Sequence, residues 1–236
     1  MKRAALSIAL AALAWGQQFE VVSLKQTSTK DGSFTFDFPA GGRFTGRNLA
    51  VKNLLRISYQ LEDYQIAGGP SWMDSTGFDI EAKPSVELSR EQVRQAIQAL
   101  LADRFHLVSH RETRQLPIYA LVVGKAGSKL QPAAGDASSN GTFKMGELKA
   151  PKMSMSGLAS ILTFDLKRPV RDQTGLKGDF AFSLDWTRGL TESDAGPSAR
   201  PSIFTAVQEQ LGLKLESTKG PVEVLVVDRL EMPTGN

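Results

Sequence analysis

The sequence predicts an α+β protein with two similar halves, each with the order strand-helix-strand-helix-strand-strand, mostly antiparallel sheets and helices on one face. Segments whose hydrophobic residues alternate are interleaved with segments whose hydrophobic residues have helical spacing. This order of segments occurs twice along the 236 residues. Gly42 and Gly146, like Pro117 and Pro221, lie 104 residues apart, and this shared offset indicates an internal duplication.

The first half starts with a predicted hairpin. Residues 19–24 are rich in β-forming side chains, and residues 33–38 alternate, with three phenylalanines on one face. A Pro-Ala-Gly-Gly turn at 39–42 then leads into a further strand at 43–48. We therefore expect 33–38 and 43–48 to pair.

Helical and strand patterns alternate through the rest of the first half. Ser89 and Gln92 form a capping box at the start of its second helix. We expect a helix at 51–60, strands at 64–67 and 78–82, a helix from 89 to near 105, and two antiparallel strands at 107–112 and 118–123.

The second half repeats these parts after residues 126–141, which lack apolar periodicity and predict a flexible loop. The domains are accordingly placed at 17–125 and 142–236, as two separate domains or as one joint domain. In the second half we expect strands at 145–150, 170–172 and 180–186, helices at 156–166 and 202–211, and closing strands at 213–218 and 222–229.

The N-terminal residues have the pattern of a signal peptide. Lys2 and Arg3 precede an apolar run at 4–15 that is short for a membrane span, and Ala14-Trp15-Gly16 supplies small residues for cleavage. We expect residues 1–16 to be removed and the mature chain to be periplasmic or extracellular. Because the chain has no cysteine, we expect neither a lipoprotein anchor nor a disulfide.

Composition limits the classes of partner. The formal net charge of +3 falls to +1 when Lys2 and Arg3 are removed, so charge does not favour a nucleic-acid partner. No stretch of the mature chain reaches the roughly 20 apolar residues of a membrane-spanning helix. We expect a protein or envelope partner, no nucleic acid, and no membrane span in the mature chain.

Seven segments carry a resemblance to a known family. They are FEVVSLK (19–25), FPAGGRF (38–44), IAGGPSW (66–72), LLADRF (100–105), HRETR (110–114), DQTGLKG (172–178) and LGLKLESTKGP (211–221). Together they resemble an uncharacterised family of exported acidobacterial proteins, catalogued as a domain of unknown function (DUF3738-like). The resemblance implies export and a family fold, but it brings no activity and no catalytic residues. The domain also resembles one found fused behind membrane metallopeptidases of the β-lactam-sensor type, and this resemblance hints at a sensing or partner-binding role.

The histidines offer a candidate metal site. His106 and His110 lie four residues apart near a strand start, and Glu112 shares their face. Four strand residues span about 13 Å, which is too far for one zinc ion. An exposed, charged edge strand is therefore the favoured interpretation, and we expect no metal and no cofactor.

No catalytic motif is recognisable. Gly-x-Ser-x-Gly is absent, and Ser156 has the setting of a helix N-cap. Asp63, Asp74 and Asp79 are available carboxylates, but the sequence does not place them at the separation that glycoside hydrolysis needs. We predict no catalytic residue.

The Gly-Gly-Pro-Ser-Trp segment at 68–72 lacks the lysine and the following helix of a phosphate-binding loop. A turn that packs Trp72 against the helix at 51–60 is the favoured interpretation. In the alternative, Tyr64 and Trp72 form an exposed aromatic contact, and these two are the candidate binding residues.

Because no catalytic set converges, we expect a non-catalytic binding or interaction module of the cell envelope or the extracellular space. One alternative is a hydrolase of envelope or extracellular substrates that uses carboxylates between the halves. The other is a small-solute sensor, for which the duplicated halves would clamp the solute.

Overall fold

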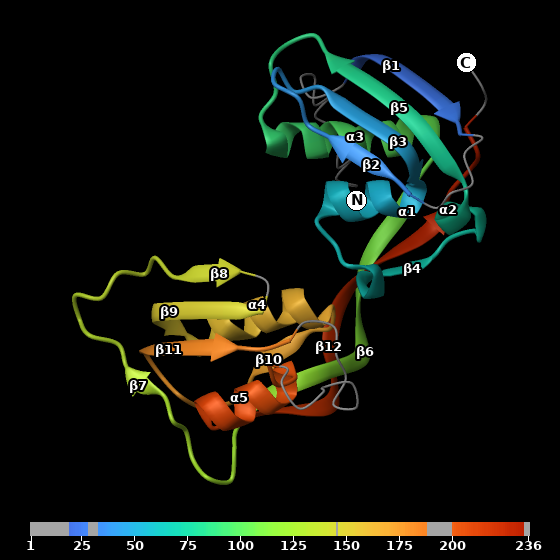
Figure 1. Cartoon of the computed structure of the whole chain (residues 1–236). Helices are drawn as coiled ribbons and strands as arrows, with labels where there is room; N and C mark the ends of the chain where they lie inside the picture. The colour runs from blue at the N-terminus through green and yellow to red at the C-terminus, as the bar shows by residue number, and fades with distance from the viewer. Residues whose placement is uncertain (1–18, 28–32, 145, 188–199, 234–236) are drawn as a thin grey trace, which may run out of the picture. The chain divides into compact units, whose positions relative to one another are not determined.

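The computed structural model describes residues 19–27, 33–144, 146–187 and 200–233. These residues form five α-helices and twelve strands in mostly antiparallel sheets, so the predicted α+β fold is confirmed (Figure 1). The predicted signal peptide at 1–16 lies outside the described residues. No helix in the described ranges is long and apolar enough to cross a membrane.

The first sheet has the strand order β1-β5-β3-β2, and all neighbours in it are antiparallel. The pairing of Thr35 with Arg47 joins β2 to β3 and confirms the predicted hairpin. Alternate residues of β5 are buried, because helices pack on one face of this sheet. The strands are β1 (Phe19–Gln26), β2 (Thr35–Asp37), β3 (Phe44–Ala50) and β5 (Gly77–Pro84).

The second sheet has the equivalent order β7-β11-β9-β8. Its strands are β7 (Gln131–Pro132), β8 (Thr142–Lys144), β9 (Glu147–Ser154) and β11 (Asp179–Asp185). The sequence predicted only a loop at 126–141, and this was wrong for β7. Two residues are too few to show a period of two, so β7 has no signature in the sequence.

A shared irregularity supports the duplication of the two sheets. The pairing of β3 with β5 shifts register between Gly46 and Leu49. The pairing of β9 with β11 shifts between Ala150 and Met153, the equivalent residues at the 104-residue offset. The two halves therefore share a β-bulge as well as an order of elements.

Helices cover one face of each sheet (Figure 1). The helices are α1 (Val51–Tyr59), the 3-10 turn η1 (Asp63–Gln65), α2 (Trp72–Ser75) and α3 (Arg90–Arg104) in the first half, and α4 (Met155–Leu166) and α5 (Ile203–Leu211) in the second. The capping box of Ser89 and Gln92 is formed as predicted. The N-cap of α4 is Ser154, which accepts a hydrogen bond from Gly157 N, and not the predicted Ser156.

Each predicted pair of closing strands is a single long strand. β6 (Val108–Val123) replaces the pair at 107–112 and 118–123, and β12 (Leu213–Arg229) replaces the pair at 213–218 and 222–229. Pro117 has a φ that suits an extended chain, so it does not turn β6. A Cβ on Gly220 would lie 2.4 Å from Ile118 Cδ1, so Gly220 allows close packing rather than a turn.

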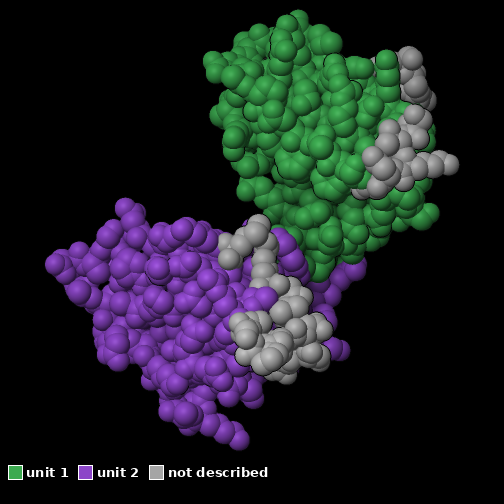
Figure 2. Space-filling model, in the orientation of Figure 1, with its two compact units in different colours: residues 1–112, 224–236 green, residues 113–223 purple. Residues whose placement is uncertain are grey.

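The chain divides into two compact units, drawn in different colours in Figure 2. Unit 1 comprises residues 1–112 and 224–236, and unit 2 comprises residues 113–223. The predicted halves 17–125 and 142–236 therefore each contribute to both units. β6 runs from unit 1 into unit 2 and β12 runs from unit 2 into unit 1, and the two are neighbours in the order β10-β6-β12-β4.

The strands β10, β6, β12 and β4 form the third sheet, and each of its two outer strands pairs within a single unit. β4 (Ile66–Gly68) pairs in parallel with residues 225–227 of β12, all in unit 1. β10 (Val170–Asp172) pairs in parallel with residues 119–121 of β6, all in unit 2. Each half of the sequence thus supplies a strand end to the unit formed mainly by the other half.

Gly68 provides a test of the close approach of β4 to β12. Its φ is +74°, and a Cβ there would lie 2.8 Å from the Val227 carbonyl oxygen. We expect Gly68→Ala to lower the free energy of unfolding by about 2–4 kcal/mol, because the cost of a positive φ at alanine adds to the cost of the clash between its Cβ and the Val227 carbonyl oxygen. Gly41→Ala is the matched control, because Gly41 has φ +85° but nothing within 4 Å, and it should cost about 1 kcal/mol. Urea unfolding measures both, and equal losses would contradict the close approach.

Candidate functional site

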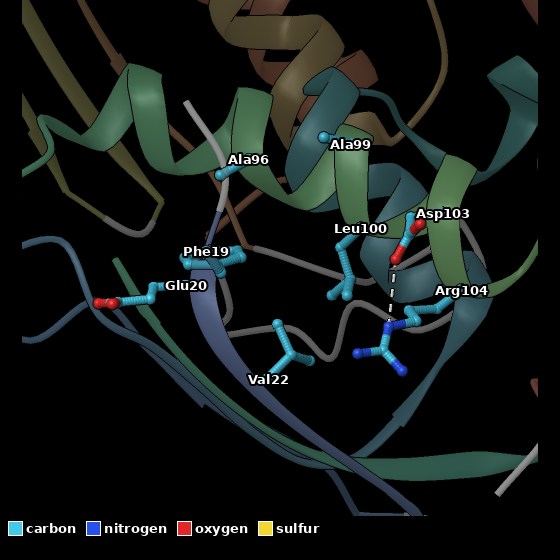
Figure 3. Close-up of a pocket in the computed structure, with 8 residues that line it drawn as sticks. All are labelled: Phe19, Glu20, Val22, Ala96, Ala99, Leu100, Asp103 and Arg104. Carbon is cyan, nitrogen blue, oxygen red and sulfur yellow. Dashed lines mark ion pairs between the residues drawn. The ribbon is translucent and has the colours of Figure 1, made fainter. Parts of the chain in front are cut away.

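A groove between β1 and α3 is the candidate functional site, and it lies wholly within unit 1. Its cavity volume is about 140 Å³. The lining residues are Phe19, Glu20 and Val22 of β1 and Ala96, Ala99, Leu100, Asp103 and Arg104 of α3 (Figure 3). The groove therefore combines apolar side chains with charged groups, and most of its accessible lining is polar.

The hollow exists because α3 carries small residues where it passes β1. The apolar stripe of α3 packs on the first sheet, with Ile97 and Leu101 fully buried. Ala96 and Ala99 present only methyl groups toward the groove, so the helix does not fill the space above β1. In Figure 3, Phe19 on β1 lies below Ala96 of the helix.

The charged groups of the groove differ in their pairing. Asp103 and Arg104 form an ion pair of 3.2 Å between Oδ2 and Nε. Glu20 is exposed and forms no ion pair with any residue in the described ranges. The groove thus has one carboxylate, that of Glu20, that is free to meet a cation on a ligand.

β1 also presents a free backbone edge beside the groove. Thr27 N donates to Gly77 O at 2.9 Å, so the backbone N–H and C=O groups of Thr27 point toward β5. In an antiparallel ladder these groups point toward the neighbouring strand at every second residue, so those of the odd-numbered residues of β1 from Val21 onward also point toward β5. The N–H and C=O groups of Val22, Leu24 and Gln26 therefore point away from β5. No strand in the described part of the chain pairs with this side of β1.

In the second sheet a side chain caps part of the backbone that the short strand β7 leaves unpaired. β7 takes the position of β1 but pairs only with Phe180 and Ala181 of β11. Farther along β11, Gln210 Oε1 accepts from Asp185 N at 2.9 Å, and Gln210 Nε2 donates to Asp185 O at 2.8 Å. The side-chain amide of Gln210 thereby replaces a neighbouring peptide group. The edge of β1 has no such cap among the described residues.

The predicted binding residues Tyr64 and Trp72 lie outside the groove. Tyr64 is in η1 and Trp72 begins α2, and both are half-buried. Trp72 packs against the core cluster of unit 1, which includes Leu54 and Leu55 of α1. The structure does not bring the two aromatic residues into a shared pocket with the groove residues.

The histidines lie apart and are paired with carboxylates. His110 Nδ1 donates to the Asp228 carboxylate at 2.8 Å, and its Nε2 lies 3.9 Å from Glu112. His106 Nε2 lies 3.9 Å from Glu231. No group of three or more metal-ligating side chains occurs in the ranges that the structure describes.

The three aspartates considered for hydrolysis each pair with a different partner. Asp63 lies 3.1 Å from Arg56 Nε, and Asp74 lies 3.4 Å from Lys52 Nζ. Asp79 accepts from Asn48 N at 2.9 Å and so holds the bulge of β3. These contacts are those of surface charges and a bulge cap rather than of a shared carboxylate site.

Comparison with known proteins gives a family match. A family model described as "Protein of unknown function (DUF3738)" matches residues 52–230. No curated protein and no solved structure matches the chain. The match covers α3 of the groove but begins after β1.

His110 generates a prediction about pH. The hydrogen bond to Asp228 raises the pKa of His110, desolvation opposes this, and the charges of Asp228 and Glu112 raise it further. A folded-state pKa above the unfolded value means that the contribution to stability is complete below about pH 6.5 and is lost as pH rises through the folded pKa. We expect His110→Gln to lower the free energy of unfolding more at pH 5.5 than at pH 8.5, as measured by urea unfolding. The same loss at both pH values would contradict the role of the charged pair.

Proposed function

The chain belongs to a family of proteins of unknown function (DUF3738), and we propose that it acts as an exported, non-catalytic module that binds a protein partner at the edge of β1. The observation that carries the proposal is that a strand edge with no partner strand among the described residues lies beside a groove. A strand edge supplies backbone hydrogen bonds to a partner, and an adjoining groove supplies specificity for its side chains.

Export rests on the sequence pattern of residues 1–16 and on the family resemblance. A periplasmic or extracellular location places the β1 edge where envelope and secreted proteins are its candidate partners. An exposed edge is a liability for aggregation, and natural proteins usually block theirs. In unit 2 the Gln210 amide caps the backbone of Asp185, where β7 leaves β11 unpaired, whereas no described residue is seen to cap the outer side of β1 in this way, and this favours a binding role for that edge.

The alternatives receive less support from the β1–α3 groove and from the groups with shifted pKa values. The groove, at about 140 Å³, is smaller than the roughly 300–1,000 Å³ typical of small-molecule sites, which disfavours a solute sensor there. The groups whose pKa values are shifted, His110, Glu147, Lys149 and Glu231, belong to ion pairs and are exposed or half-buried. No specific observation therefore favours the hydrolase.

Gln26→Pro tests the proposal. Gln26 is exposed and its N–H points away from β5, so proline there removes an edge donor without breaking the ladder to β5. We expect the chain comprising residues 17–236 to capture one protein from an envelope and medium extract of its source, and Gln26→Pro to reduce that capture about tenfold. Quantitative mass spectrometry measures the capture.

The matched control is Gln26→Thr, which changes the same side chain but keeps the N–H. It should capture the partner as the unaltered chain does. The proposal is wrong if no partner is captured, or if Gln26→Pro and Gln26→Thr capture it equally.

A further inference from the structure

We propose that the ligand of the β1–α3 groove is an extended peptide segment that adds to β1 as a strand, inserts one large aliphatic side chain between β1 and α3, and places a lysine or arginine beside Glu20. This inference rests on the proposed function and assigns the chemistry of its ligand. Three features of the groove carry it.

The first feature is the spacing of the free backbone groups. Val22, Leu24 and Gln26 present their N–H and C=O groups on the same side of β1. Alternate residues of a strand are about 6.8 Å apart, which matches the spacing of the groups that an antiparallel strand offers in return. An extended segment of about six residues therefore satisfies the whole edge.

The second feature is the size of the hollow. The groove is partly open to solvent and has a volume of about 140 Å³, close to the roughly 150 Å³ of a cavity that holds a benzene-sized group. Phe19, Val22 and Leu100 supply apolar side chains below α3 (Figure 3), and Ala99 contributes only a methyl group to the lining. One leucine, isoleucine or methionine side chain has the size to fill this space.

The third feature is charge. Arg104 already pairs with Asp103, whereas Glu20 has no ion-pair partner in the described part of the chain. An anionic ligand would meet this unpaired carboxylate, and a cationic one would neutralise it. Charge complementarity therefore selects a lysine or arginine next to the aliphatic anchor.

A second groove in unit 1 serves as an internal control. It lies between β2 and α1, has a volume of about 170 Å³, and is lined by Phe34, Phe36 and Ile57 among others. β2 has only three residues, so it offers a shorter edge than β1. Phe36→Ser changes this second groove while leaving the β1 edge intact.

The test is selection from a phage-displayed library of random decapeptides on the chain of residues 17–236. A synthetic peptide with the selected consensus is then titrated calorimetrically. We expect a consensus that combines an aliphatic residue with a lysine or arginine. The dissociation constant should rise about tenfold in Gln26→Pro and stay unchanged in Gln26→Thr and Phe36→Ser.

Two further substitutions separate the side-chain contacts. Ala99→Leu fills the hollow with a good helix former and should abolish binding, whereas Ala99→Ser should not. Glu20→Gln should weaken binding by about two- to fivefold, in keeping with an exposed ion pair. Circular dichroism confirms that each variant is folded.

Several results would overturn the inference. One is a consensus that is acidic or lacks an aliphatic residue, and another is binding that Phe36→Ser abolishes and Gln26→Pro does not. A dimer of the chain in sedimentation that Gln26→Pro dissociates would show that a second copy occupies the edge. If no peptide is selected while the extract still yields a partner sensitive to Gln26→Pro, the peptide chemistry is wrong and the proposed function stands. If both fail, the proposed function is wrong as well.

Discussion

The pairing of β6 with β12 is the interaction on which the rest of the structure depends. Buried backbone N–H and C=O groups need hydrogen-bond partners, and the three-residue strands β4 and β10 pair with the far ends of these two long strands. Because β6 and β12 each pass from one compact unit into the other, each unit is completed by a strand end from the other half of the sequence. The two similar halves of the sequence are therefore interdependent, and the units do not coincide with them.

The two units have the same strand order in their sheets, but they differ in the outermost strand and in the helix beside it. Both sheets have the same strand order and the same bulge, yet α3 has 15 residues and α5 has 9. In unit 1 a full strand, β1, lies beside β5, and the long helix passes over it with alanines that leave a groove. In unit 2 the equivalent strand is only two residues long, and Gln210 caps the backbone of Asp185. The proposed binding site thus lies where the two similar units differ.

Much of the fold follows from local sequence patterns, and the site does not. The capping box at Ser89, the left-handed Gly212 after α5 and the alternation in β5 are local features, so the elements they define were predictable. The sequence predicts a pair of strands in place of each of the long strands β6 and β12, because Pro117 and Gly220 are residue types common in turns. Only the structure shows that Gly220 packs against Ile118 within a continuous strand. The groove had no signature, because a free strand edge is a property of strand order, and a single sequence does not reveal which strand lies outermost. Ala96 and Ala99 were the available signal, but alanine is also the commonest choice for an ordinary helix.

The central claim is that a partner adds to the outer edge of β1. Amide hydrogen exchange of the chain, free and with its partner or the selected peptide bound, tests this most directly, since it reports the protection of individual N–H groups. The account predicts that exchange slows on binding at Val22, Leu24 and Gln26, whose N–H groups face outward, with little change at Ser23 and Lys25, which already face β5. Protection confined to other parts of the chain, with these three amides unchanged, would contradict it.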